Sequence, residues 1–290
     1  MLIRSVRRCG ISLLSAAALL LGVASVAGAQ AAAADPNPGA LTISGATDFT
    51  SAYMFRGIRQ EDDNLIMQPY FDLGIAAYSG DGGLKSVGVN FGTWNSLHKG
   101  LSGTEGPSGK FWYESDFYAT LGLGFGGGFT FGTTYTAYTS PGNYWHAIHE
   151  IAFKVSVDDS AKLGKGALKP YGLVAFELTD GQADAGDNKG IYVELGVAPG
   201  VTAGKAAVSF PIKVGLSAKD YYEFGTGSDS KFGYFSAAGV VTVPISSHWN
   251  VHGGVEFQSY GENVKVYNGY GDDGDRPYTG IASIGLGFSF

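Results

Sequence analysis

The chain has 290 residues, and its 26 acidic and 19 basic side chains give a formal net charge of -7. This acidic balance argues against nucleic acid as a partner. The 46 glycines disfavour a helical protein, and an aromatic content of 13% disfavours a disordered one.

The N-terminus predicts a secretory signal peptide over residues 1–29. A basic start, MLIRSVRR, precedes the apolar run ISLLSAAALLLGVASVAG, and small residues with Ala-x-Ala sites follow. Cleavage is expected after Ala29, with cleavage after Ala31 as a second choice. A transmembrane helix is the alternative, because the run is about long enough to span a bilayer. Cys9 is the only cysteine, so the mature chain has none and forms no internal disulfide.

Residues 30–40 predict a flexible leader, and residues 41–290 a single domain without further membrane helices. Short segments of this domain alternate between large apolar and small or polar residues, which is the period of a β-strand. Clusters of Gly, Asp, Asn and Ser separate the segments. Twelve strands are expected near 41–55, 65–78, 86–97, 110–123, 128–139, 144–157, 169–179, 190–198, 208–219, 232–243, 249–260 and 278–290. Pro69 and Pro211 fall inside two of them, so a bulge or a wrong limit is expected there.

The connections alternate between mostly short turns, such as GGG and ISSH, and mostly longer polar loops. An even strand count with this alternation is typical of bacterial outer-membrane barrels. The sequence therefore predicts an all-β fold, a single antiparallel transmembrane β-barrel of about 12 strands. Its expected place is the outer membrane of a Gram-negative bacterium, with outer-membrane lipid around it and the short turns in the periplasm.

The charges fall on one face of the predicted strands. With the larger apolar residues placed outward, no charged side chain shares their face, and a charge in the middle of a lipid face costs about 2–4 kcal/mol for Lys or Arg. Four strands carry two charges each, on a single face: Asp48 with Arg56, Glu114 with Asp116, Glu150 with Lys154, and Lys213 with Lys219. The residues expected to line the lumen are Asp48, Arg56, Asp72, Glu114, Asp116, Glu150, Lys154, Glu177, Glu194, Lys213, Lys219 and Glu256.

A soluble β-sandwich or a secreted barrel would show the same alternation, with the apolar face inside. Three features favour the membrane: strands of about 10–14 residues, unequal loops, and aromatic residues toward the strand ends. These aromatic residues are Tyr53, Phe55, Tyr78, Trp145, Trp249, Tyr278 and Phe290.

The last strand ends on an aromatic residue, with Leu286, Phe288 and Phe290 on one face. This ending resembles the assembly signal of outer-membrane proteins, which implies the barrel-assembly machinery as a partner. The first mature strand resembles the opening of TorF-type porins through a Ser-x-Tyr-x-Phe-Arg-Gly core and a following Gln. The matching residues are Ser51, Tyr53, Phe55, Arg56, Gly57 and Gln60. The resemblance implies a porin-like channel and says little about its cargo.

The other motifs do not predict a metal site or a catalytic site. His146 and His149 point to opposite faces of a strand, and His248 and His252 stand about 13 Å apart at strand rise. The acidic loop GDDGDRP lacks EF-hand spacing. His252 and Ser259 differ in register, so no nucleophile with an adjacent base is found. We therefore expect no catalytic residue, no metal and no cofactor.

Twelve strands predict a narrow lumen, since eight leave no channel and sixteen leave a wide one. Six inward aromatic residues would narrow it further: Tyr70, Trp94, Trp112, Tyr118, Tyr138 and Tyr192. The expected function is passive diffusion of small hydrophilic solutes, with a weak cation preference because eight of the twelve lumen charges are acidic. The alternatives are a non-conducting scaffold or adhesion barrel and, less favoured, a barrel lipase or deacylase. The pattern leaves the solute and the oligomeric state open.

Overall fold

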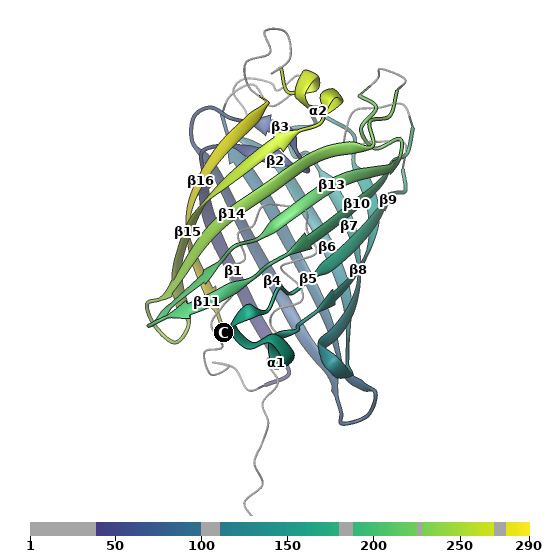
Figure 1. The fold of residues 1–290 in the computed structure, drawn as a ribbon. Coiled ribbons are helices and arrows are strands. Elements are labelled where there is room, and N and C mark those ends of the chain that lie inside the picture. The colour runs from purple at the N-terminus through teal and green to yellow at the C-terminus, as the bar shows by residue number, and fades with distance from the viewer. Residues whose placement is uncertain (1–38, 100–110, 180–187, 225–227, 270–276) are drawn as a thin grey trace, which may run out of the picture.

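A computed structural model describes residues 39–99, 111–179, 188–224, 228–269 and 277–290. These residues form a closed antiparallel β-barrel of 12 strands (Figure 1). The predicted signal peptide and all but the last two residues of the predicted leader lie outside the described residues. The wall strands are β1 (Leu41–Thr50), β4 (Ile66–Ser79), β5 (Leu84–His98), β6 (Trp112–Phe125), β7 (Phe129–Thr139), β8 (Ile148–Val157), β9 (Tyr171–Glu177), β10 (Ile191–Val197), β13 (Ile212–Lys219), β14 (Phe232–Pro244), β15 (Trp249–Tyr260) and β16 (Tyr278–Ser289).

Each wall strand pairs with its neighbours in the chain, and β1 pairs with β16 to close the barrel. In this seam Asp48 lies opposite Gly285, and the last residue exchanges two backbone hydrogen bonds with Ile43. Closure leaves no free edge among the twelve wall strands, which is the condition for strands to cross hydrocarbon. The predicted fold class is confirmed.

The remaining elements lie at the two ends of the barrel, which differ (Figure 1). The turn end carries the short connections, the hairpin of β11 (Gly200–Ala203) and β12 (Ala206–Ser209), and α1 (Ser160–Leu163) with the 3-10 turns η1 (Gly126–Gly128) and η2 (Gly164–Gly166). The loop end carries the long connections, α2 (Glu262–Tyr267), and the hairpin of β2 (Tyr53–Phe55) and β3 (Ile58–Glu61). No helix within the described ranges is long and apolar enough to cross a membrane.

Burial alternates along the wall. Outward side chains such as Val255 (66% exposed) and Ile284 (59% exposed) form an apolar surface of Val, Ile, Leu and Phe. Inward neighbours such as Glu256 and Trp94 are buried. A soluble barrel would show the reverse, with its apolar residues inside and its charges in water.

Two expected strand limits need correction, and one predicted proline stays inside its strand. The first strand was expected to reach residue 55, but β1 ends at Thr50. Pro211 lies in a break between β12 and β13, because proline supplies no donor to a ladder. Pro69 stays inside β4, where the ladder to β5 passes from Met67 directly to Tyr70.

Two bulges reverse the orientation of residues that the alternation placed inward. Between β5 and β6, Ser96 pairs with Glu114 and Leu97 with Trp112, so Tyr113 is the extra residue. Trp112 is therefore 50% exposed, and its indole donates to outward Asn95. The prediction that Trp112 lines the lumen is wrong, because one inserted residue shifts the side-chain alternation by one.

A second irregularity lies at the loop end of β13, where Ile191 pairs with Lys219 and Tyr192 with Ser217. The Lys219 side chain is 65% exposed and lies 3.5 Å from Asp220. The prediction that Lys219 lines the lumen is therefore also wrong.

Candidate functional site in the barrel lumen

The hairpin of β2 and β3, residues 53–61, which we call the plug, lies inside the loop end of the barrel. Tyr53, Met54, Phe55, Arg56 and Ile58 are all buried. Its turn approaches β14 at Tyr234, and its side chains reach β6 and β8. In a barrel of 12 strands, β6 and β14 stand opposite each other in the sheet order. The plug therefore crosses the lumen.

The turn of the plug consists of Arg56 and Gly57, with φ of 50° and 83°. Two positive φ values in a two-residue loop are typical of a type I′ hairpin turn. Gly57 also approaches the wall closely, because a Cβ there would lie 2.9 Å from Cβ of Tyr234. A left-handed backbone is uncommon for arginine and marks a position whose surroundings hold it in place.

Arg56 makes a bidentate ion pair with Glu150 of β8. Nη1 and Nη2 donate to the two carboxylate oxygens at 2.6 and 2.8 Å, and the two side chains are 1% and 3% exposed. Nη1 also donates to the Tyr221 hydroxyl at 2.9 Å. The guanidinium carbon lies 4.1 Å from the centre of the Tyr192 ring, within cation–π range.

Residues of the loop end fix the backbone of the plug. The Tyr222 hydroxyl donates to the carbonyl of Arg56 at 3.0 Å. Asn268 donates to the carbonyl of Gly57 and accepts from the amide of Arg59, both at 2.8 Å. A buried backbone group without a partner is costly, so these two side chains take the place of a neighbouring strand.

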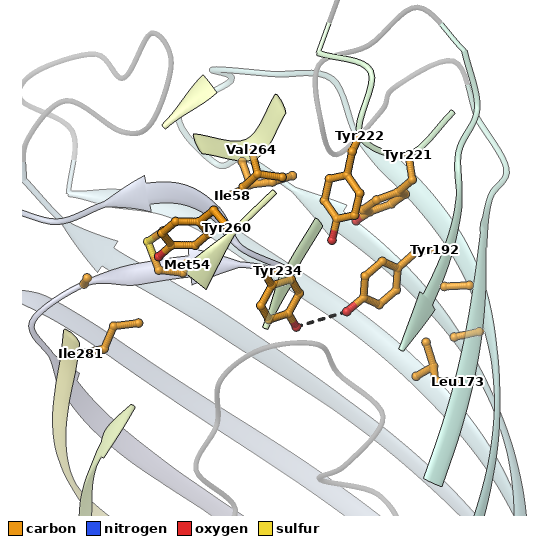
Figure 2. Close-up of a cluster of buried hydrophobic side chains, with 13 residues drawn as sticks. Met54, Ile58, Leu173, Tyr192, Tyr221, Tyr222, Tyr234, Tyr260, Val264 and Ile281 are labelled. Atoms are coloured by element: carbon orange, nitrogen blue, oxygen red, sulfur yellow. Dashed lines mark hydrogen bonds between the residues drawn. The ribbon is translucent and has the colours of Figure 1, made fainter. Parts of the chain in front are cut away.

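Alternation along β2 sends its side chains to two apolar clusters. The first cluster joins Tyr53 and Phe55 to the β4–β8 side of the wall, at Ile66, Trp94, Tyr113, Tyr138 and Ile148. The second joins Met54 and Ile58 to the opposite side, at Tyr192, Tyr221, Tyr222, Tyr234, Tyr260, Val264 and Ile281 (Figure 2). Burying each large side chain contributes about 1.5–3 kcal/mol.

Two buried carboxylates of β6 lie beside the first cluster. The Tyr53 hydroxyl donates to Glu114 at 2.8 Å. Asp116 is 1% exposed, and its carboxylate oxygens have no hydrogen-bond partner among the residues that the structure describes. A buried polar group in this condition is costly and calls for a specific explanation.

Beneath the plug, toward the turn end, inward polar side chains pair with one another; we call this set the lower network. His252 Nε2 lies 2.6 Å from Asp48 Oδ1. The pair meets above Gly285, where a Cβ would stand 2.1 Å from Asp48 Oδ1 and 2.4 Å from His252 Nε2. Asp72 accepts from Asn90 at 2.6 Å and from Tyr118 at 3.0 Å.

The lower network continues around the wall. Glu256 accepts from Ser236 at 2.5 Å and Gln258 at 2.8 Å. Glu194 accepts from Tyr171, Tyr192 and Tyr234, and the Lys154 ammonium lies 4.2 Å from the centre of the Tyr171 ring. A cavity of about 20 Å³, enough for one water, lies between the plug and β15–β16 and is lined by Met54, Glu256 and Ser283 among others.

Nine of the predicted lumen charges are buried on the wall: Asp48, Asp72, Glu114, Asp116, Glu150, Lys154, Glu177, Glu194 and Glu256. Lys213 is half-buried and lies 5.8 Å from the centre of the Tyr234 ring. Arg56 lies inside the barrel, but on the plug and not on the first strand, so it does not share a strand face with Asp48 as expected. Of the predicted aromatics, Trp94, Tyr118, Tyr138 and Tyr192 are buried and Tyr70 is half-buried.

The aromatic end of the chain lies at the turn end, on the outside. The Phe290 ring stacks on His248, with centres 4.7 Å apart, and Phe288 lies 5.4 Å from Trp249. Leu286 is exposed on the same face. These contacts place the predicted assembly signal on the outer surface, and its recognition by the assembly machinery stays a prediction.

The histidines are dispersed. His149 lies on the outward face with its Nδ1 2.5 Å from the Tyr135 hydroxyl. The His252 ring is hydrogen-bonded to Asp48 and to Asn250. Within the described ranges, no three His, Cys, Asp or Glu side chains come together as a metal site. The acidic loop with Asp272, Asp273 and Asp275 lies outside them.

The plug is the feature that the sequence analysis missed. A signal for it exists: Arg56-Gly57 is a two-residue turn ending in glycine, flanked by the β-type residues Tyr53, Phe55 and Ile58. The alternation instead predicts Tyr53 and Phe55 as the end of a first strand over 41–55.

Comparisons with known proteins found barrels of similar extent. A KdgM porin in complex with disordered oligogalacturonate aligns with a TM-score of 0.44 and 6% identity, over 86% of this chain and 99% of its own. A NanC porin aligns with a TM-score of 0.42 and 10% identity, over 86% and 99%. The outer membrane phospholipase A of Escherichia coli aligns with a TM-score of 0.43 and 15% identity, over 87% and 93%.

No family model matches the chain, and no curated protein matches it in sequence. The resemblance of the first strand to TorF-type porins therefore stays a prediction.

Proposed function

We propose that this protein is a porin-like channel of a Gram-negative outer membrane, closed at its loop end by the plug, for passive diffusion of small hydrophilic solutes. One observation carries the proposal: a closed barrel turns an apolar surface outward and encloses at least nine charged wall residues. An interior of this kind is costly to build and suits the passage of water and polar solutes.

In the proposed mechanism, a solute enters when the plug moves away from the wall. The strands stay in place, and no covalent step is involved. TorF-type porins, which the first strand resembles, fit this class. Phe290 and its neighbours would serve the assembly machinery, and the outer surface would contact lipid.

The open lumen should prefer cations. Eight buried wall carboxylates outnumber two wall lysines, Lys154 and Lys213, and Arg56 is neutralised by Glu150. Carboxylates that line a confined path attract cations, and salt weakens the effect.

The test is planar-bilayer conductance of the refolded barrel and of a variant in which residues 52–64 are replaced by a short Gly-Ser linker. We expect brief, rare openings from the unaltered chain and a persistent, several-fold larger conductance from the variant. A zero-current potential across a salt gradient should show cation preference. The variant must first show heat-modifiable migration, which establishes that it is folded.

A second candidate is a non-conducting scaffold barrel. It is favoured by the plug itself, because the side chains of the plug and the wall fill the loop end of the lumen. If neither the unaltered chain nor the linker variant conducts, the result supports the scaffold and overturns the channel. Among the residues that the structure describes, no catalytic constellation supports the lipase alternative, and we propose that the protein is not an enzyme.

A further inference from the structure

Arg56 and the groups that contact its guanidinium, which we call the clamp, come from two separable parts of the molecule. The guanidinium belongs to the plug, whereas the groups that receive it belong to the wall and to the loop after β13. Those groups are the Glu150 carboxylate, the Tyr192 ring and the Tyr221 hydroxyl. If the plug moves away, a carboxylate inside an aromatic enclosure is left without its cation.

The geometry of the clamp suits a guanidinium group specifically. Two parallel N–H donors match the two oxygens of Glu150 at 2.6 and 2.8 Å, and the flat face lies over Tyr192. An ammonium group has no planar fork, so it cannot make both contacts in this way. The Tyr138 hydroxyl, 3.2 Å from Glu150 Oε1, helps to orient the carboxylate.

Arg56 is not an ideal occupant of this clamp. Its buried Nε has no hydrogen-bond partner within the described ranges, and its backbone φ is +50°. Both features add cost to the closed state. In addition, Asp116 lies on β6 opposite Tyr138 in the ladder, and no described residue forms a hydrogen bond with its carboxylate oxygens. The wall near the clamp therefore holds a further buried acid group that the plug does not pair.

We propose that Glu150, Tyr192 and Tyr221 form a binding site for small guanidinium-bearing solutes, which Arg56 occupies while the channel is closed. Such a solute competes with Arg56 for Glu150 and so favours release of the plug. This inference deepens the proposed function, on which it rests for the path of the solute. It identifies planar organic cations as the preferred solute class.

The experiment measures binding in detergent, without any conductance. The folded Arg56→Ala variant is titrated with N-ethylguanidinium at constant ionic strength, and the midpoint of heat-modifiable unfolding is followed. We expect a saturable rise in the midpoint, absent with urea or sodium and at least tenfold weaker in Arg56→Ala with Glu150→Gln. The unaltered chain should respond only at much higher concentrations, because Arg56 competes.

Arg56→Lys serves if the alanine variant does not fold, because it keeps a charge beside Glu150. N-ethylguanidinium should bind it saturably too, more weakly than it binds the alanine variant. Absence of saturable binding, an equal response to urea, or insensitivity to Glu150→Gln would overturn the inference. A barrel that conducts without binding N-ethylguanidinium refutes this inference alone, and one that binds without conducting refutes the proposed channel alone.

Discussion

The plug and the lower network both bury charge inside the same barrel, yet they satisfy it in different ways. The plug depends on residues distant in the chain: Glu150 is 94 residues from Arg56, Tyr222 is 166, and Asn268 is 211 from Gly57. The lower network pairs side chains on neighbouring or next-neighbouring strands, as in Asp72 with Asn90 and Ser236 with Glu256.

This difference indicates which part can move. The lower network needs only the wall, so it should persist when the plug is displaced. The plug needs the wall, the loop after β13 and α2 together. Displacement of the plug can therefore open the loop end while the hydrogen bonds of the lower network stay intact.

The largest effect should come from breaking the Arg56–Glu150 pair on one side. Arg56→Met leaves Glu150 buried and unpaired, and removal of one partner of a buried pair costs about 3–5 kcal/mol. The double variant Arg56→Met with Glu150→Gln should recover much of that loss. Urea unfolding from micelles, followed by tryptophan fluorescence, measures both.

The matched control is Lys231→Met, which breaks an exposed pair with Asp229. An exposed pair of this kind contributes about 0–1 kcal/mol. A loss from Arg56→Met no larger than that of the control would mean that the plug is not held by its ion pair.

The next effect concerns the lower network, at Gly285. A methyl group there would displace Asp48 and His252 from each other, so Gly285→Ala should cost about 2–3 kcal/mol, within the range for a buried group that loses its partner. Gly280→Ala on the same strand is the control, because a Cβ there meets nothing within 4 Å. Equal unfolding midpoints for the two variants would show that the Asp48–His252 pair does not stabilise the wall.

A smaller effect tests the backbone of the plug. Tyr222→Phe removes the hydrogen bond to the carbonyl of Arg56 and should cost about 1 kcal/mol. It should also increase the frequency of openings in a bilayer, since the lower network is untouched. Tyr78→Phe, at an exposed position of the turn end, should change neither quantity.

The smallest effect concerns the turn end and depends on pH. Hydrogen bonds from the backbone of Lys169 and Leu168 lower the pKa of Asp159, and a hydrogen bond from the side chain of Ser160 lowers the pKa of Asp158. A carboxyl whose pKa is lowered by folding stabilises the fold above its unfolded pKa of about 3.9. That contribution is lost as the pH falls through the lower folded value.

Asp159→Asn should therefore lower the unfolding midpoint slightly at pH 7, and the difference from the unaltered chain should vanish at pH 2. Asp81→Asn, in the β4–β5 turn, is the matched control. A difference that persists at pH 2 would assign the effect to packing instead of charge.

The wall could be predicted from sequence because its pattern is local. A strand with one face to lipid and one to a polar interior repeats every two residues, and this repeat located all twelve strands to within a few residues. Glycine and polar clusters marked the turns between them. Trp112 and Lys219 were placed on the wrong face because a single inserted residue reverses the alternation without altering its appearance.

The Arg56-Gly57 turn is a local signal for the hairpin of the plug, but the position of this hairpin inside the lumen could not be predicted, because its strands have the same pattern as the wall. Tyr53, Phe55 and Ile58 are β-type residues, whether they face lipid or fill a lumen. What distinguishes them is their partners, and Glu150, Tyr222 and Asn268 lie far away in the chain. Distant pairings of this kind leave no periodic trace in a single sequence.

Only Ser51 and Ala52 separate the plug from β1, which forms half of the closing seam. Ser51 is itself fastened to β16: its amide donates to the carbonyl of Ala282, and its hydroxyl accepts from the amide of Ala282, both at 2.9 Å. A force that draws the plug out of the lumen is thus carried into the joint between the first and last strands. We expect such a force either to extend Ser51 and Ala52 or to separate β1 from β16, depending on whether the hydrogen bonds of Ser51 hold.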